Sequence, residues 1–226
     1  SKRSGSGSIQ ALRQKGYLAQ ALVNYMARLG HYYEKPQLMS LNELAAEFSL
    51  EAISKSPAKF DDTHLDFWQK EAVAKLTDAE FVQWIHASIK YSVPEADMEK
   101  FVRTIKENII FPEEAQAWAK VLYQDKLDFS PEAQEILHAA GADFFKVAIQ
   151  SIEKNGTDYA KLCEHLKTTL NVKGKGLFMP LRLALTNEAH GPELAKIIDL
   201  LGKEKVIKRF EQAMGSVIST RHLNED

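Results

Sequence analysis

The sequence predicts an all-α fold, and three observations support this prediction. Apolar residues recur at spacings of three and four along almost the whole chain, as in the run from Leu22 to Leu29. Ser40–Glu43 and Thr77–Glu80 both have the form of a capping box directly before an apolar run. Strand-like alternation and hairpin turns are scarce. Together these patterns favour a chain of helices joined by short loops.

The expected helices follow one another from the N-terminus. Gly30 stands where the first long helix would end. Pro94, Pro112 and Pro131 each precede acidic residues and an apolar run, which is typical of proline in a first helical turn. Further helical spacing covers Met98–Ile109, Ala115–Leu122, Glu132–Leu137, Phe145–Ile152, Leu162–Leu170 and Ile197–Leu201.

One segment breaks the helical spacing. Asn171–Gly176 combines two glycines with Lys173 and Lys175 before the chain continues into Leu177–Arg182. A loop of this kind can present backbone amides and side-chain cations to a polyanion.

The charges nearly cancel in total but are unevenly distributed. The 226 residues carry 29 Lys and Arg against 31 Asp and Glu, a net charge of −2, which argues against a polybasic tail or an electrostatic membrane anchor. Residues 1–35 have six basic and one acidic side chain, residues 36–160 have twelve and twenty-two, and residues 161–226 have eleven and eight. The ends are therefore basic and the middle acidic, which by itself leaves open whether a nucleic acid binds.

Composition also indicates a compartment. The single cysteine, Cys163, excludes an internal disulfide and the usual cysteine-rich zinc sites, and it fits a reducing environment. The sequence has no run of the roughly 20 apolar residues that a membrane span needs. We therefore expect a soluble, cytoplasmic protein without zinc. The absence of an initial Met suggests a fragment, and Ser4–Ser8 has the composition of a linker.

No local pattern forms a complete active site. The sequence contains no phosphate-cradling P-loop and no dinucleotide fingerprint, and its seven histidines lack metal-ligand spacing. Cys163 and His165 are too close in sequence to favour a nucleophile–base pair, so Cys163 is interpreted as a buried helix residue. The acidic pairs Asp61-Asp62 and Glu113-Glu114 are interpreted as helix-start residues.

Four side chains remain open to two interpretations each. Trp68, Trp84 and Trp118 suit core or inter-helix packing, but one of them could be a stacking platform for bases. Arg182 is either a salt-bridged helix residue or a ligand contact.

Several stretches together carry a family resemblance. They are Ser1-Lys2-Arg3, Gly16–Gly30, Ser56–Asp61 with Leu65, Lys173–Lys175, Leu177–Thr186, His190–Leu194 and Leu200–Glu204. In combination they resemble the bacterial-type glutamyl-tRNA synthetases, specifically the half that follows the catalytic domain. Ser1-Lys2-Arg3 is similar to the end of the family's Lys-Met/Leu-Ser-Lys-Arg signature. The resemblance therefore weakens the interpretation of Ser4–Ser8 as a linker.

The sequence departs from the family pattern at four places. His64 stands where the family usually has Lys, Gln69 where it often has Asn, and Asn187 where it often has Gly. Tyr32–Pro36 replaces a more typical Gly-Asp turn. These differences affect the expected contacts more than the family resemblance.

The resemblance implies a domain organisation. It predicts a class I synthetase stem-contact segment followed by an α-helical anticodon-binding region in two subdomains. Residues 1–75 would hold the end of the catalytic signature loop and the stem-contact domain. Residues 76–152 and 153–226 would form the first and second anticodon-binding subdomains.

The resemblance also implies roles for individual residues. Lys2 would contact ATP phosphates in the parent enzyme. Arg182 would read anticodon bases, because a planar guanidinium can form paired hydrogen bonds to a base edge or stack on its face. Gly191, Pro192 and Leu194 would pack on splayed anticodon bases, and Lys173 and Lys175 would contact tRNA phosphates. Arg13, Lys15 and Tyr17 would support a contact with the inner corner of the tRNA.

The implied function is tRNA recognition within a glutamate–tRNA ligase. The parent would use ATP and Mg²⁺ to attach glutamate to tRNA-Glu and would be monomeric, with no DNA or membrane partner. The fragment by itself would need no cofactor and would be inactive. Two alternatives remain: a non-discriminating or tRNA-Gln-directed paralogue, and a helical protein-interaction scaffold without RNA binding.

Overall fold

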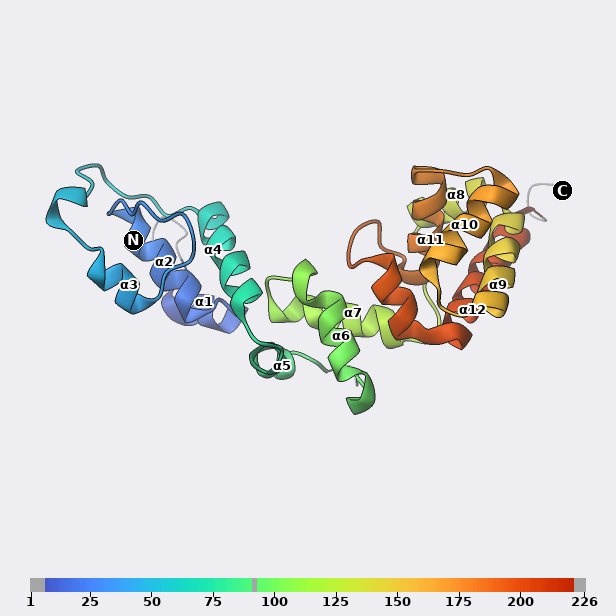
Figure 1. Cartoon of the computed structure of the whole chain (residues 1–226), viewed down its shortest axis with the longest axis horizontal. Helices are drawn as coiled ribbons and strands as arrows, with labels where there is room; N and C mark the ends of the chain where they lie inside the picture. Colours follow the sequence, from blue (N-terminus) through green and yellow to red (C-terminus); the bar gives the residue numbers. More distant parts are fainter. Residues whose placement is uncertain (1–6, 91–92, 222–226) are drawn as a thin grey trace. The chain divides into compact units, whose positions relative to one another are not determined.

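The structure is a computed structural model that describes residues 7–90 and 93–221. Within these ranges the chain forms helices and no β-strand, apart from an isolated bridge between His31 and Ile53. The predicted all-α class is confirmed (Figure 1). The α-helices are α1 (Ile9–Lys15), α2 (Ala19–Leu29), α3 (Leu41–Ala46), α4 (Asp62–Lys75), α5 (Asp78–His86), α6 (Met98–Ile105), α7 (Pro112–Tyr123), α8 (Pro131–Ala140), α9 (Ala142–Asn155), α10 (Tyr159–Leu170), α11 (Lys175–Thr186) and α12 (Leu194–Arg221). The 3₁₀-helices are η2 (Leu50–Ala52), η3 (Glu95–Asp97) and η4 (Lys106–Asn108).

Side-chain caps form the expected helix starts. At α3 the Ser40 hydroxyl accepts a hydrogen bond from the Glu43 N–H, and the Glu43 carboxylate accepts one from the Ser40 N–H at 2.7 Å. Thr77 and Glu80 make the same reciprocal pair at α5. Ser130 caps α8 directly before Pro131. Each cap satisfies N–H groups that have no partner inside the helix.

The two acidic pairs also lie at helix starts, as the sequence indicates. Asp61 accepts a hydrogen bond from the Thr63 N–H at 2.8 Å where α4 begins. Glu114 accepts hydrogen bonds from the N–H groups of Ile110 and Phe111, both at 2.8 Å, where α7 begins. These carboxylates therefore act as caps.

The region after Pro94 differs from the predicted pattern. Pro94 precedes the short helix η3, and α6 begins only at Met98. The run Met98–Ile109 is not one helix, because α6 ends at Ile105 and is followed by η4. The chain passes from one compact unit to the other at this point.

The chain divides into two compact units. Unit 1 comprises residues 1–90 and 106–116, and unit 2 comprises residues 91–105 and 117–226. The three-part division into 1–75, 76–152 and 153–226 stays a prediction. Its second boundary falls inside α9, which packs against both α10 and α12.

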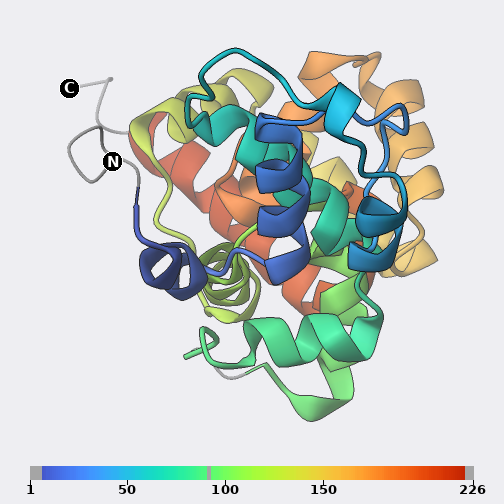
Figure 2. The ribbon, with the colours of Figure 1, turned by 90° about the vertical axis from the view of Figure 1, so that its left-hand side faces the viewer.

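Unit 1 is built around the packing of α2 against α4, which lie side by side in Figure 2. Its buried core is formed by Tyr17, Ala21, Tyr25, Leu65, Trp68 and Ala72. Gln69 lies fully buried beside this core, donates hydrogen bonds to the carbonyls of Gly16 and Ile110, and accepts one from the Leu18 N–H. Gln69, which stands where the family often has Asn, therefore joins three separate segments of unit 1.

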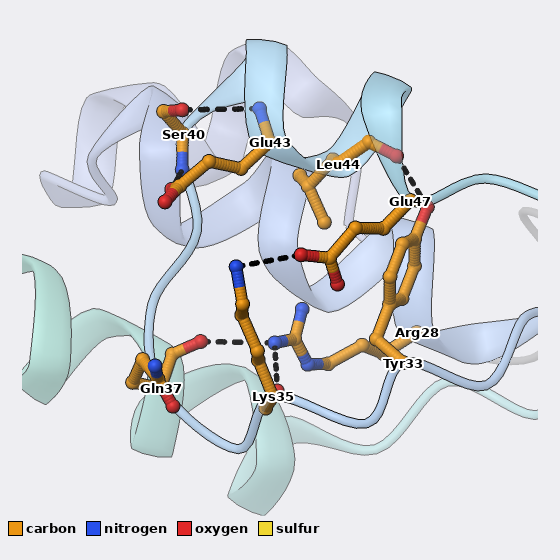
Figure 3. Close-up of polar contacts among 8 residues, drawn as sticks. All are labelled: Arg28, Tyr33, Lys35, Gln37, Ser40, Glu43, Leu44 and Glu47. Atoms are coloured by element: carbon orange, nitrogen blue, oxygen red, sulfur yellow. Dashed lines mark hydrogen bonds and ion pairs between the residues drawn. The ribbon is translucent and has the colours of Figure 1, made fainter.

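The segment Tyr32–Pro36, another departure from the family pattern, is held by α2 and α3 (Figure 3). Arg28 donates hydrogen bonds to the carbonyls of Lys35 and Gln37, both at 2.9 Å. Lys35 forms an ion pair with Glu47 at 2.6 Å. The Arg28 guanidinium also lies 4.2 Å from the centre of the Trp68 ring, which places Trp68 in packing.

Unit 2 is a helical cluster in which α9 packs against α10 and α12, while α11 packs against α8 and α12. Phe144, Phe145 and Phe210 are fully buried at its centre. α12 is interrupted at Gly202, whose φ of 77° is outside the helical region. Cys163 is buried on α10, as predicted.

Candidate nucleic-acid interface

Helix α11 positions Arg182, the residue that the sequence singled out most strongly. The helix begins after Gly174, whose φ of 56° is in the left-handed region, and ends at Asn187 with φ 57°. The Asn187 side chain accepts a hydrogen bond from the Ser130 N–H at 3.0 Å and donates one to the Asp128 carbonyl at 2.9 Å. The C-terminal end of α11 is thereby joined to the segment before α8.

Arg182 has one fixed nitrogen and one without a partner. Its Nη2 donates a hydrogen bond to the Pro192 carbonyl at 3.0 Å. Its Nη1 is buried and has no hydrogen-bond partner among the described residues. Burial lowers the pKa of the guanidinium, and the nearby Tyr159 acts in the opposite direction. A guanidinium in this state has unused hydrogen-bonding capacity. Because an unpaired buried donor costs free energy, an acceptor brought to Nη1 would be bound favourably.

A pocket of about 250 Å³ lies beside this guanidinium. Its lining residues are Tyr159, Phe178, Arg182, Glu193, Leu194 and Ala195. Phe178 is 41% exposed, whereas Leu194 is 5% exposed, so Phe178 offers the more accessible apolar surface. Two aromatic rings, an aliphatic wall and one cation are the elements that recognise an unstacked base.

The predicted residues of the 191–194 segment are found at this place. Pro192 supplies the carbonyl for Arg182, and Leu194 forms part of the pocket wall. Pro192 and Leu194 are both buried, so they offer less surface to a base than the sequence suggested. Gly191 has φ 142°, and a Cβ added there would overlap with Cη2 and Cζ2 of Trp118. Glycine is therefore required at position 191 because the backbone there passes close to the ring of Trp118.

Lys173 and Lys175 are both exposed at the start of α11. The first turn of this helix contains no acidic side chain. A helix N-terminus carries partial positive charge from its free N–H groups, so two lysines there add to a positive field. Phosphate groups are a suitable counter-charge for this arrangement.

Four residues that line the pocket were not predicted as site residues: Tyr159, Phe178, Glu193 and Ala195. Two of them, Tyr159 and Phe178, supply its aromatic rings. Phe178 precedes Arg182 by one helical turn, so helical spacing could have placed both on one face. Tyr159 comes from α10, and no sequence pattern connects it to Arg182. Burial and its contact with Cys163 raise the pKa of the Tyr159 hydroxyl, so it stays neutral near neutral pH.

The contacts expected at the N-terminal end have different outcomes. Lys2 lies outside the described residues. Tyr17 is a core residue whose hydroxyl donates to Asp66, and its ring meets Phe111 edge-on at 4.9 Å. Lys15 lies 4.5 Å from the centre of the Phe111 ring. Trp84 donates a hydrogen bond to the Gly16 carbonyl at 3.0 Å, which assigns it to packing within unit 1.

Within residues 7–90 and 93–221, no three His, Cys, Asp or Glu side chains are grouped so that they could hold a metal ion. In the same residues, no helix is both long and apolar enough to cross a membrane.

The comparisons with known proteins agree on one assignment. The family model described as "Anticodon binding domain" matches residues 77–214. A "Glutamate--tRNA ligase 2" of Coxiella burnetii is 43% identical over 213 residues, which cover 94% of this chain and 46% of that protein. A "Glutamate--tRNA ligase 2" of Nitrosococcus oceani is 41% identical and is matched over 95% of this chain and 45% of its own length.

A solved structure shares the fold. A glutamate tRNA ligase from Elizabethkingia meningosepticum superposes with a TM-score of 0.77 at 21% identity, covering 91% of this chain and 43% of that chain. The chain thus spans slightly less than half the length of the relatives that it matches.

Proposed function

The chain belongs to the anticodon-binding domain family, and from this membership we propose that it is the tRNA-binding portion of a glutamate–tRNA ligase. The whole ligase would attach glutamate to tRNA-Glu with ATP and Mg²⁺ in the cytoplasm, as a monomer. The contribution of this chain would be recognition of the tRNA. No step through ATP or Mg²⁺ is assigned to the described residues, because Lys2 lies outside them and they hold no cluster of metal ligands.

The observation that carries this proposal is the state of Arg182. The Pro192 carbonyl fixes one side of the guanidinium, and the unpartnered Nη1 belongs to a side chain that lines the pocket. An anticodon base that enters between Phe178 and Leu194 would supply the missing acceptor after a small side-chain shift. Arg182 and Leu194 would then contact the base, with Phe178 as a stacking surface. Gly191 and Pro192 would complete the anticodon site through their backbone, because the Pro192 carbonyl holds Arg182.

Lys173 and Lys175 would bind the tRNA backbone. Both are exposed at the positively charged start of α11, which also carries Arg182. Contacts to phosphates set the register of a nucleic acid without reading its sequence, whereas contacts to base edges supply specificity. The two lysines and Arg182 would thus have separable effects on binding.

The test measures binding of the chain to transcripts of tRNA-Glu, tRNA-Gln and tRNA-Glu with substituted anticodon bases, at several salt concentrations. We expect Arg182→Ala to cost about 1–3 kcal/mol on the cognate anticodon and little on the substituted ones. Lys173→Gln with Lys175→Gln should weaken all transcripts alike and lower the salt slope by about 1–2.

The matched control is Lys146→Gln with Lys154→Gln, which makes the same charge change at two exposed positions on α9. The control should leave anticodon selectivity and the salt slope near their wild-type values. Equal binding of tRNA-Glu and tRNA-Gln would favour the non-discriminating alternative. Absence of binding to any tRNA would reject the proposal and favour the protein-interaction scaffold.

A further inference from the structure

The contact between Gly191 and Trp118 lies directly beside the pocket. The backbone of Gly191 rests on the edge of the indole, where Cη2 and Cζ2 occupy the place that a Cβ would take. Its φ of 142° is also a conformation that other residues rarely adopt. Two independent features therefore restrict this position to glycine, and both result from the path of the backbone over Trp118.

This backbone path determines where Arg182 is held. The residue after Gly191 is Pro192, whose carbonyl is the acceptor for Arg182 Nη2 at 3.0 Å. The next two residues, Glu193 and Leu194, line the pocket together with Arg182. A displacement of Gly191 would consequently move the acceptor of the guanidinium and one wall of the pocket together.

Arg209 fixes the spacing between the helices that carry these residues. It is fully buried and donates hydrogen bonds to the carbonyls of Val121 and Gln124, at 2.7 Å and 3.1 Å, where α7 ends. Its Nη1 also donates to the Leu185 carbonyl, near the end of α11. Trp118 on α7 and Arg182 on α11 are thus both attached to helices that one buried side chain holds.

We propose that Trp118 is a positioning residue for Arg182. Trp118 supports the backbone at Gly191 and thereby places the Pro192 carbonyl, which in turn aims the guanidinium at a base. This inference rests on the proposed function and deepens it by naming a residue that sets specificity without touching the RNA.

The test is a double-mutant cycle of Trp118→Ala and Arg182→Ala in the full chain. The measured quantity is selectivity, defined as the affinity for tRNA-Glu divided by that for a transcript with a substituted anticodon. We expect Trp118→Ala to lower selectivity about tenfold, and to lower it no further when Arg182→Ala is already present. Trp118→Phe should restore part of the selectivity, because a smaller ring still supports the backbone.

If Trp118→Ala fails to fold, Gly191→Ala offers a second way to displace the backbone at position 191. It should lower selectivity as Trp118→Ala does, because the added methyl group pushes the backbone away from the indole. Trp84→Phe is the matched control, since Trp84 packs in unit 1 and should leave selectivity at the wild-type value.

The outcomes separate the two proposals. If Arg182→Ala itself leaves selectivity unchanged, the proposed function of the pocket is wrong. If Arg182→Ala lowers selectivity but Trp118→Ala and Gly191→Ala do not, Trp118 has no positioning role. The inference is also overturned if Trp118→Ala weakens all transcripts equally, or if its effect adds in full to that of Arg182→Ala.

Discussion

Asn187 ends α11 in the left-handed region, with φ 57°. Bacterial-type glutamyl-tRNA synthetases, which the sequence resembles, often have glycine at this position. Asparagine tolerates this conformation better than most residues, because its short side chain can bond to nearby backbone. Here the side chain bonds the Ser130 N–H and the Asp128 carbonyl. Glycine could adopt this left-handed conformation, but it has no side chain to form hydrogen bonds. Asparagine at this position therefore adds two hydrogen bonds.

We expect Asn187→Ala to lower the free energy of unfolding by about 2 kcal/mol, because both hydrogen bonds are lost and alanine is strained at this φ. Asn187→Gly should cost about half as much, since glycine removes the strain but not the lost bonds. Urea titration followed by circular dichroism measures both. Equal losses for the two variants would contradict this account of the position.

At the scale of elements, Arg209 on α12 connects the ends of two other helices of unit 2, α7 and α11. It is a buried cation whose hydrogen-bond partners are backbone carbonyls of the α7 and α11 ends. Carbonyls at a helix C-terminus carry partial negative charge and have no partner inside the helix. Burial lowers the pKa of Arg209 to about 10, which still leaves the group charged at neutral pH.

Replacing Arg209 with methionine should lower the free energy of unfolding by about 3 kcal/mol or more, because several buried carbonyls lose their donor. Arg209→Lys should cost less, since an ammonium can still donate to some of them. The control is Lys208→Met at the adjacent exposed position, with an expected change within about 0.5 kcal/mol. A similar loss for Arg209→Met and Lys208→Met would show that the carbonyl contacts contribute little.

The whole molecule should lose stability in alkaline solution because of three tyrosines. Burial is the leading cause that raises the pKa of Tyr17, Tyr123 and Tyr159, with a further contribution from Asp66 at Tyr17. The unfolded chain releases these protons near pH 10 while the folded chain keeps them. Their contribution to stability is therefore fully present below about pH 10 and is lost as the pH rises above it.

Arg209 acts in the opposite direction, because the lowered pKa lets the folded state lose that proton first. Burial also lowers the pKa of Arg28, Arg182 and Lys205, which act in the same direction as Arg209. The pKa values of the three tyrosines are raised furthest, so the urea midpoint should show a net fall between about pH 9 and about pH 11. The variant with Tyr17→Phe and Tyr123→Phe should show a shallower fall, even if it is less stable at neutral pH. A midpoint that rises over this range would contradict the expectation.

Local sequence accounts for much of the fold. The capping boxes at Ser40 and Thr77, and the Asp61 cap, were predictable because each involves residues within three positions of one another. The break between α6 and η4 was not, because apolar spacing continues through it while the chain leaves one compact unit for the other. Periodicity reports which face is apolar but not which unit buries it.

The sequence alone determined the helical class, the capped helix starts at Ser40, Thr77 and Asp61, and the family, because helical periodicity, capping and motif order are properties of neighbouring residues. It also singled out Arg182, Pro192 and Leu194 as candidate site residues, which the tertiary structure brings together. Only the tertiary structure decided that Tyr159 and Phe178 complete the pocket, that Gly191 rests on Trp118, and that Arg209 joins two helix ends. These contacts join residues far apart in the chain, and their geometry follows from the packing of whole helices rather than from any local pattern.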